Sequence, residues 1–501
     1  MSAMEMKNYQ LIGSYGKYYS LDAPIFSGSQ PKLPVLEEED PPVMGKLISL
    51  PNVDHLTFSS TRFCLERPDG VELDSLQRLS ALLKYSAGII RIDPLNKYLL
   101  HKAIPSARSC FLSRLSVALF QTDEWRIYRY NAEHHMLVLD SIATVDMELA
   151  ADLPEGINAA ILLSTDVSKI LSSYGDFSPY LAMLEAGHCT AMIRILANAV
   201  EVEQFDLKLG PAAVDIFPNV AMWKDASALI TRKVFYLRVE LDNPQKYEQE
   251  FVCPNGNIRV NAQQNDSEAS PSRYRFLRSM CRDLPGHSVP LEKMPDQSKK
   301  IVAPPGFDLC RAIRQRSSGP YRSFLSGTSA MDSGRLERML ATGHCRMSRV
   351  KLAPSLEKQF VIYILALRIN GLRQGVYKVV TNHGWQLEPV KEQEIADTVQ
   401  NALDPDYAWL DTGSVPFVAL FASDIHELMS EPGVTNFERI QETAGILSQV
   451  MSLALADIDY FSRPIKSGSE LLLETLLENN MHINYALVSG QRRHDDFCLN
   501  F

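Results

Sequence analysis

The chain has 501 residues, enough for two or three domains. Its composition, 46% hydrophobic and 22% charged, is that of an ordinary soluble protein, and the net charge of −10 argues against a nucleic-acid-binding protein. No apolar run approaches the ~18 residues of a membrane span, and the first residues lack the features of a signal peptide. The eight cysteines form no CxxC pair, so we expect no metal, reduced thiols and a cytoplasmic location.

The first half predicts an arm, a helix and a hairpin. Residues 1–50 are rich in Pro, Gly, Ser and Tyr, which indicates an extended arm. Apolar residues at helical spacing predict a helix over 72–89 that ends at Gly88. Residues 101–140 predict a loop followed by two strands, with a hairpin turn around Thr122-Asp123.

A change in composition separates the two halves. The first half continues with a short apolar strand over Ala159–Asp166 and a strong helix over Leu181–Ala199. Residues 246–303 are polar, rich in proline and without periodicity, so we interpret them as a partly disordered linker. The linker divides a first domain, residues 51–245, from a second, residues 304–501.

Segments of the first half recur in the same order about 250 residues later. A Pro-Ser pair, at 105–106 or 354–355, precedes an apolar run and a tyrosine-containing strand. A short apolar strand and a helix with a glutamate shortly before a glycine follow, at 415–424 and 440–456 in the second half. A repeat of this length indicates a duplicated domain rather than a solenoid unit, and duplicates usually pack as the subunits of a homodimer do. Each half is compatible with an α+β or α/β fold, of which we predict α+β.

One candidate ligand-binding segment is RQRSSG, residues 314–319. Arg316 and Ser318, with Ser317 between them, could chelate a phosphate, because a guanidinium offers paired charged donors and the hydroxyl and backbone amides add more. The alternative is a basic, solvated helix end.

Other candidates are less specific. A Pro-apolar-polar-small-Gly turn at Pro464, Ile465, Lys466, Ser467 and Gly468 would leave backbone amides free to face a planar ring, or it is an ordinary helix–helix loop. The Pro-Ser pairs are also explained as turns, and the pair Arg492 and Arg493 as surface charge.

Taken in order, these pieces resemble the nitroreductase-like FMN proteins, and among them the SagB-type azoline dehydrogenases. The first half carries LSALLKYSAGI, PSA, IYRYNAEHHMLVLD and SSYGDFSPYLAMLEAGH, where those enzymes typically show an LL-x(3)-AGI helix, a PSAGA loop, a GLYRYDP-x-H-x-L strand and a KYG…LLEAGH helix. The second half carries AIRQRSSG, similar to the RRS entry motif, then GVYKV, and PIKSG in place of the P-x-E-G flavin turn. The resemblance covers most of 55–215 and 305–475.

The family is a homodimer with FMN sites at its interface. The resemblance therefore implies two tandem nitroreductase-like domains that form an internal pseudo-dimer. The second half would bind the FMN phosphate through Arg316, Ser317 and Ser318, with Arg492 or Arg493, and the ring edge through 464–468. The first half would supply Pro105, Ser106 and Ala107 against the flavin, with the Tyr174 region over its face.

The mirror-related site departs from the family pattern. Its phosphate motif should lie at 58–63, where Ser60 and Arg62 remain but the leading arginine is a serine. The segment PGVTNFERI, residues 432–440, stands where a Tyr-Gly pair is expected. The resemblance thus implies about one FMN per chain.

A second departure concerns catalysis. The family uses a Lys-Tyr pair to remove a substrate proton while hydride passes to FMN, but here Ser173 replaces the lysine and Tyr174 remains. Tyr174 could act as an acid or a base if its neighbours polarise its proton. His188 is expected to pack and hydrogen bond between the halves.

The implied function is an FMN-dependent oxidoreductase that acts on a small molecule or modified peptide by hydride transfer. The alternative is a degenerate scaffold that binds flavin or a partner without turnover. The substrate, the electron donor or acceptor and further oligomerisation are left open.

Overall fold

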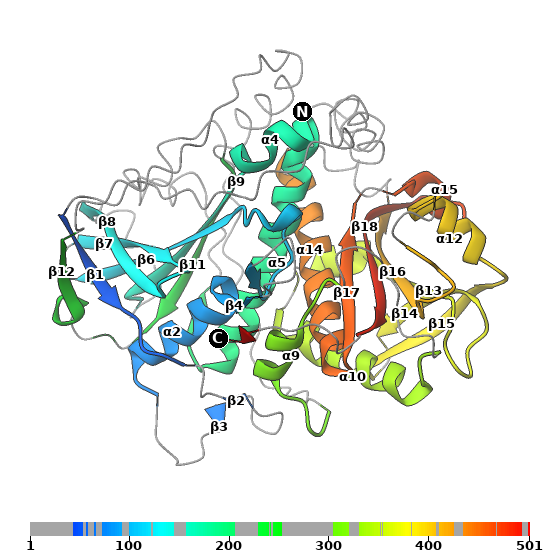
Figure 1. Ribbon diagram of the computed structural model, residues 1–501, viewed down its shortest axis with the longest axis horizontal. Coiled ribbons are helices and arrows are strands. Elements are labelled where there is room, and N and C mark those ends of the chain that lie inside the picture. Colours follow the sequence, from blue (N-terminus) through cyan, green and yellow to red (C-terminus); the bar gives the residue numbers. More distant parts are fainter. Residues whose placement is uncertain are drawn as a thin grey trace.

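Two antiparallel sheets flank a central pair of long helices in the computed structural model (Figure 1). Each sheet is built from one half of the chain. The structure describes residues 44–53, 57–58, 65–66, 73–92, 100–121, 124–144, 157–205, 229–239, 241, 244–252, 304–319, 330–350, 352, 354–381, 383–406, 410–424, 434–466, 468–492 and 499–500.

The first sheet has eight strands, and every neighbouring pair is antiparallel. Across the sheet the strands are β10 (Glu203–Phe205), β11 (Leu229–Arg238), β9 (Ala159–Asp166), β6 (Ser113–Gln121), β7 (Glu124–Asn131), β8 (Met136–Thr144), β1 (Met44–Ser49) and β12 (Glu248–Val252). Strand β9 matches the predicted strand residue for residue, and all eight of its residues are buried. The predicted hairpin is confirmed: β6 pairs with β7 up to Gln121 and Glu124, which flank its turn.

The second sheet repeats the strand order of the first. Its six strands are β17 (Tyr460–Ile465), β18 (Met481–Gln491), β16 (Phe417–Asp424), β13 (Phe360–Ala366), β14 (Gly375–Thr381) and β15 (Trp385–Glu392). In chain order, four strands, a long helix and two more strands occur in each half, and corresponding strands take corresponding places across the sheet. The segments that echo each other in sequence therefore occupy equivalent positions.

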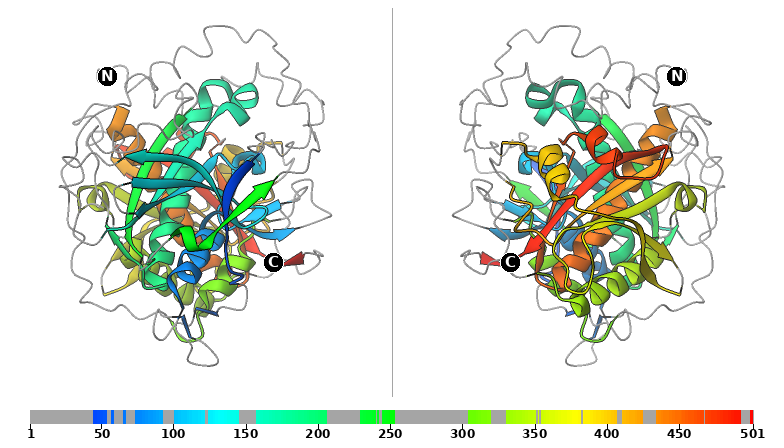
Figure 2. Two further views of the ribbon diagram at one scale, coloured as in Figure 1. Left: turned by 90° about the vertical axis from the view of Figure 1, so that its left-hand side faces the viewer. Right: turned by 90° about the vertical axis from the view of Figure 1, so that its right-hand side faces the viewer.

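The helices α5 (Ser178–Ala199) and α14 (Val434–Asp457) pack against each other between the sheets. Helix α5 is buried around almost its whole circumference. A helix that is apolar on all sides is expected to lie in the interior of a protein in this way. The end-on views show one sheet in front of these helices from either side (Figure 2). Both helices extend further toward the N-terminus than the predicted segments, 181–199 and 440–456.

Shorter helices cover the remaining surfaces. They are α2 (Ser75–Ala87), α4 (Ser168–Tyr174), α9 (Leu309–Gln315), α10 (Ser333–Val350), α11 (Pro354–Gln359), α12 (Ala396–Leu403) and α15 (Glu470–Glu474), with the 3₁₀ turns η1 (Ala107–Ser109), η2 (Gly175–Phe177) and η3 (Pro244–Tyr247). Helix α2 ends before Gly88 as predicted and begins with a capping box, in which the Asp74 carboxylate accepts from the amide of Gln77 and the Gln77 side chain accepts from the amide of Asp74.

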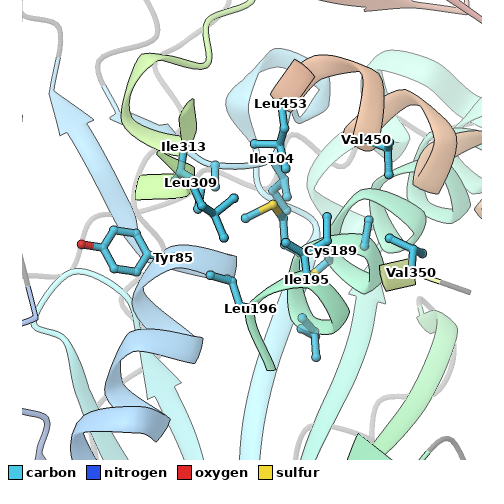
Figure 3. Packing of buried hydrophobic residues seen from close by; sticks show 14 of the residues in the cluster. Tyr85, Ile104, Cys189, Ile195, Leu196, Leu309, Ile313, Val350, Val450 and Leu453 are labelled. Carbon is cyan, nitrogen blue, oxygen red and sulfur yellow. The ribbon is translucent and has the colours of Figure 1, made fainter. Parts of the chain in front are cut away.

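One large core joins the two halves. Figure 3 shows side chains from α2, α5, α9 and α14 packed together, among them Tyr85, Ile195, Leu196, Leu309, Ile313 and Leu453. A second core fills the far face of the second sheet, under α12 and α15. Because the main core contains residues of both halves, neither half encloses it alone.

Small strands also connect distant parts of the chain. Strands β4 (Ile89–Ile92) and β5 (Leu100–Lys102) form a three-stranded sheet with β19 (Leu499–Asn500), and β2 (Thr57–Phe58) pairs with β3 (Leu65–Glu66). Strand β19 belongs to the second half but pairs with β4 of the first.

Three local expectations differ from the structure. Pro354 and Ser355 begin helix α11 instead of a turn, since the fixed φ of proline suits the first helical position. Strand β1 lies within the predicted arm and β12 within the predicted linker, because each pairs with the other at the edge of the first sheet. None of the helices in the described parts of the chain is long and apolar enough to cross a membrane.

Candidate functional site

Arg316 is a buried cation at the end of α9, with 4% of its surface exposed. Its Nη2 donates to the carbonyl oxygen of Lys102 at 3.1 Å and its Nη1 to Ser318 Oγ at 3.4 Å. Its buried Nε has no hydrogen-bond partner among the described residues. No carboxylate of the described residues forms an ion pair with the guanidinium. Burial, and then the positive charge of Arg91, lower the pKa of Arg316 to about 9. A buried, unpaired guanidinium favours an anion beside it.

Further basic groups surround Arg316. Arg91 of β4 is also 4% exposed. Burial, then Arg91 and Arg316, lower the pKa of His101 to about 3, so this imidazole is neutral. Burial and the charge of Lys169 lower the pKa of Lys102 to about 8. We call Arg91 and Arg316 the cationic cluster; it concentrates positive charge inside a chain of net charge −10.

The backbone of Ser317 and Ser318 is fixed against β17. The amide of Ser462 donates to the carbonyl oxygen of Ser317 at 2.9 Å, and Arg463 Nε donates to that of Ser318 at 2.9 Å. Arg492 Nη1 donates to the carbonyl oxygen of Gln315 at 3.1 Å. The structure thus brings the predicted phosphate residues Arg316, Ser317, Ser318 and Arg492 together, whereas Arg493 lies outside the described residues.

Both central helices reach the segment that carries Lys102. Gln449 of α14 donates through Nε2 to the carbonyl oxygen of Ala103 at 3.0 Å, and its Oε1 lies 2.9 Å from Nδ1 of His188 on α5. Burial lowers the pKa of His188 to about 3, so Nδ1 of a neutral ring donates to Gln449. The expected role of His188, packing and hydrogen bonding between the halves, is confirmed.

The predicted flavin loop, Pro105, Ser106 and Ala107, follows directly after this segment. Ser106 Oγ accepts a hydrogen bond from the amide of Phe111 at 2.8 Å, and Lys102 Nζ lies 4.6 Å from the centre of the Phe111 ring. Nearby, Glu185 of α5 accepts from the amide of Ser113 at 2.7 Å. Burial raises the pKa of Glu185 against the opposing effects of Ser106, Ser113 and Lys102.

The predicted catalytic residues lie at the end of α4, against the same loop. Arg108 Nη1 donates to Ser173 Oγ at 3.1 Å, and its guanidinium lies 5.4 Å from the centre of the Tyr174 ring. Burial raises the pKa of Tyr174, while the charge of Arg108 opposes that rise. Tyr174 is therefore protonated at neutral pH and would serve as a proton donor rather than a base. The sequence hypothesis missed Arg108, although it directly follows the quoted PSA motif.

The segment 464–468 differs from the expected turn. Pro464 and Ile465 end the edge strand β17, a position that proline tolerates because its missing amide faces away from the sheet. Lys466 Nζ donates to Glu470 at 2.7 Å and Gly468 packs closely against Leu403, both beside the second core. Lys466 is thus directed to α15 and Gly468 lies against α12 instead of the seam, and Ser467 lies outside the described residues.

An ion pair joins the second central helix to the first sheet. Glu442 of α14 pairs with Lys233 of β11. Ser60 and Arg62, the residues expected in the second phosphate motif, lie outside the described residues. Within the described ranges, no group of His, Cys, Asp and Glu side chains could hold a metal ion.

No family model and no curated protein matches the sequence. Among solved structures, a putative nitroreductase from Anabaena variabilis ATCC 29413 matches 85% of this chain and 90% of its own, with 17% identity and a TM-score of 0.63. The chain has a nitroreductase-like fold. At this identity the likeness concerns the fold alone.

Two further matches are partial. A putative nitroreductase from Ralstonia eutropha JMP134 has 15% identity and a TM-score of 0.29, over 40% of this chain and 88% of its own. The E. coli microcin synthetase McbBCD complex with truncated pro-MccB17 has 13% identity and a TM-score of 0.28, over 39% of this chain and 79% of its own. Both scores are too low to support a structural argument.

Proposed function

We propose that this protein is an FMN-dependent oxidoreductase made of two tandem nitroreductase-like domains, residues 51–245 and 304–501, that form an internal pseudo-dimer. The repeated strand order and the shared core support the pseudo-dimer. The observation that carries the cofactor is Arg316: a buried guanidinium whose Nε has no partner among the described residues suits the phosphate of FMN.

Residues of both halves would hold the cofactor. Arg316, Ser317, Ser318 and Arg492 would bind the phosphate, with Arg91 of the first half adding positive charge. Pro105, Ser106 and Ala107 would pack beside the ring. FMN, when bound, accepts or donates a hydride. The chain's own contribution is to bind the cofactor, to exclude water at the buried seam and to hold a proton on Tyr174.

The proposed reaction is a SagB-like dehydrogenation or reduction of a small molecule or modified peptide in the cytoplasm. A second candidate is a scaffold that binds flavin or a partner without turnover. Ser173 favours it, because the lysine that would remove a substrate proton in the resembling dehydrogenases is absent. The half-buried, protonated Tyr174 favours an enzyme that donates a proton instead.

Purification of the protein tests the cofactor directly. We expect a yellow protein with a flavin absorbance band at about 450 nm. Extraction should yield about one FMN per chain, because the mirror-related phosphate motif departs from the family pattern, with a serine in place of its leading arginine. Two flavins per chain would contradict the single site, and a colourless protein that FMN does not turn yellow would contradict the cofactor. Bound flavin without turnover would favour the scaffold.

A further inference from the structure

We propose that Arg108 binds a carboxylate group of the substrate beside Tyr174, so that this protein acts on an anionic small molecule or on a peptide carboxylate. The inference rests on the proposed function, since it names the substrate class of the same site. It begins with the backbone of the loop that carries Arg108.

The loop holds Arg108 in a conformation that costs energy. Arg108 has φ 51° and ψ 25°, and Ser109 and Phe111 also have positive φ values of 53° and 48°. Left-handed backbone of this kind favours glycine and is strained for other residues. Hydrogen bonds fix it: the amides of Ser109 and Cys110 donate to the carbonyl oxygens of Ser106 and Ala107 at 3.1 and 3.0 Å. A long basic side chain kept at such a position indicates that the side chain itself is used.

The guanidinium of Arg108 has no carboxylate partner within the described ranges. Its Nη1 donates to Ser173 Oγ, and the guanidinium also donates a hydrogen bond to the side chain of Tyr174, whose ring centre lies 5.4 Å away. These two contacts leave further N–H groups of the guanidinium available. Nε and Nη2 form one planar pair of donors, whose spacing matches the two oxygens of a carboxylate.

The surroundings also favour an anion. Lys169 Nζ lies 3.4 Å from the carbonyl oxygen of Phe111, in the same loop, and Lys102 lies over the Phe111 ring. The nearby acid, Glu185, is buried, and burial raises its pKa while Lys102 opposes that rise. A substrate carboxylate at Arg108 would lie next to the Tyr174 hydroxyl, the proposed proton donor.

The test compares two ligands of the same shape and different charge. Benzoate and benzamide share a ring, but only benzoate is anionic at pH 7. We expect isothermal titration of the purified full chain to show benzoate binding about tenfold or more tightly than benzamide, as for charge-assisted hydrogen bonds. The substitution Arg108→Gly should bring this ratio to about one. The substitution Arg108→Lys should reduce it, since lysine cannot bind both oxygens in one plane.

Stability and flavin content separate the possible causes. Arg108→Gly should keep the melting temperature or raise it, because glycine relieves the positive φ, and should keep the FMN content, because the phosphate is bound at Arg316. Equal binding of both ligands by the wild type, or an unchanged ratio in Arg108→Gly, would overturn the proposal. So would a lower melting temperature with equal loss of both ligands, which would indicate a structural role. A protein without FMN that still prefers benzoate through Arg108 would contradict the cofactor and support the carboxylate site.

Discussion

Gly187 of α5 and Gly445 of α14 face each other where the central helices cross. A Cβ atom on Gly445 would overlap the carbonyl oxygen of Leu184 and lie 3.1 Å from the Cα of Gly187. A Cβ atom on Gly187 would in turn overlap the carbonyl oxygen of Glu442. Each glycine thus meets the carbonyl of the residue three positions before the other, so the contact is reciprocal.

The substitution Gly187→Ala tests this crossing. The added methyl group has no flexible neighbour to displace, so the helices must separate. We expect the free energy of unfolding in urea to fall by about 1–3 kcal/mol or more. The control is Gly334→Ala at the start of α10, where the nearest atom is the side-chain Oδ1 of Asp332, at 3.0 Å, and where alanine should be neutral or slightly stabilising. Equal stability of both variants would refute the close contact.

The substitution Arg316→Ala tests the proposed phosphate contact. It removes a charge-assisted interaction worth about 1.5–3 kcal/mol, so the dissociation constant of FMN should rise by about tenfold or more. Circular dichroism should show an intact fold. Arg373→Ala is the matched control, because Arg373 is 83% exposed and pairs with Glu392 away from the seam. An unchanged affinity in Arg316→Ala would place the phosphate elsewhere, and Arg492 would be the next residue to replace.

The substitution Tyr174→Phe tests the proton donor. It retains the ring beside Arg108 and Phe177 but removes the hydroxyl. We expect FMN content to stay constant and steady-state turnover to fall by about 10²-fold or more. Tyr247→Phe, at an exposed tyrosine, should change neither. A mild effect at Tyr174 together with a severe effect of Ser173→Ala would assign the proton to Ser173.

The substitution Ser173→Lys tests the likeness to azoline dehydrogenases. Arg108 Nη1 lies 3.1 Å from Ser173 Oγ, so a lysine at 173 would meet a like charge. We expect azoline oxidation to rise only when Arg108→Gly is introduced as well, as measured with synthetic azoline substrates. The absence of a gain in the double variant would point to a different substrate class.

The dependence of stability on pH tests the neutral histidine at the seam. The pKa of His188 is about 3 in the folded protein, against about 6.5 when unfolded, so below pH 6.5 the unfolded chain binds a proton that the folded chain does not. Stability should therefore fall as the pH falls from 6.5 toward 3, by about 1.4 kcal/mol per pH unit for this residue, and should not depend on His188 above that range.

Urea unfolding at several pH values gives the measurement. His188→Asn keeps a donor for Gln449 but does not titrate. The slope of its unfolding free energy against pH, measured between pH 6 and 4, should therefore be smaller than that of the wild type by about 1.4 kcal/mol per pH unit. His101, whose pKa is also about 3, leaves part of the slope in the variant.

Local patterns were sufficient to predict much of the fold. Strand β9 is an unbroken apolar run and helix α5 a long apolar one, so burial alone specifies them. The Pro-Ser pair at 354–355 was misassigned because proline fits both a turn and the first turn of a helix, and only the following residues decide between them. Pro464 was misassigned because its place at a sheet edge depends on β18, more than fifteen residues further along.

The site was less predictable, because its contacts join residues that are far apart in the chain. Arg316 donates to Lys102 across 214 positions, and Gln449 to Ala103 across 346. The local sequence around Arg316 suggests that this segment binds an anion. It does not show that strands β4 and β5, more than 200 positions earlier in the chain, lie beside Arg316. Arg108 was missed for a different reason: its importance depends on a backbone φ of 51°, which the sequence does not show.

The pairing of β19 with β4 has a consequence for the order of synthesis. Leu499 pairs with Ile92 and Asn500 with Arg91, so the segment that carries Arg91 is flanked by residues translated about 400 positions later. Domains generally fold as units during translation, from the N-terminal end. The first half therefore leaves the ribosome with an open strand edge at β4, and that edge is closed only when residues 499 and 500 emerge and reach it.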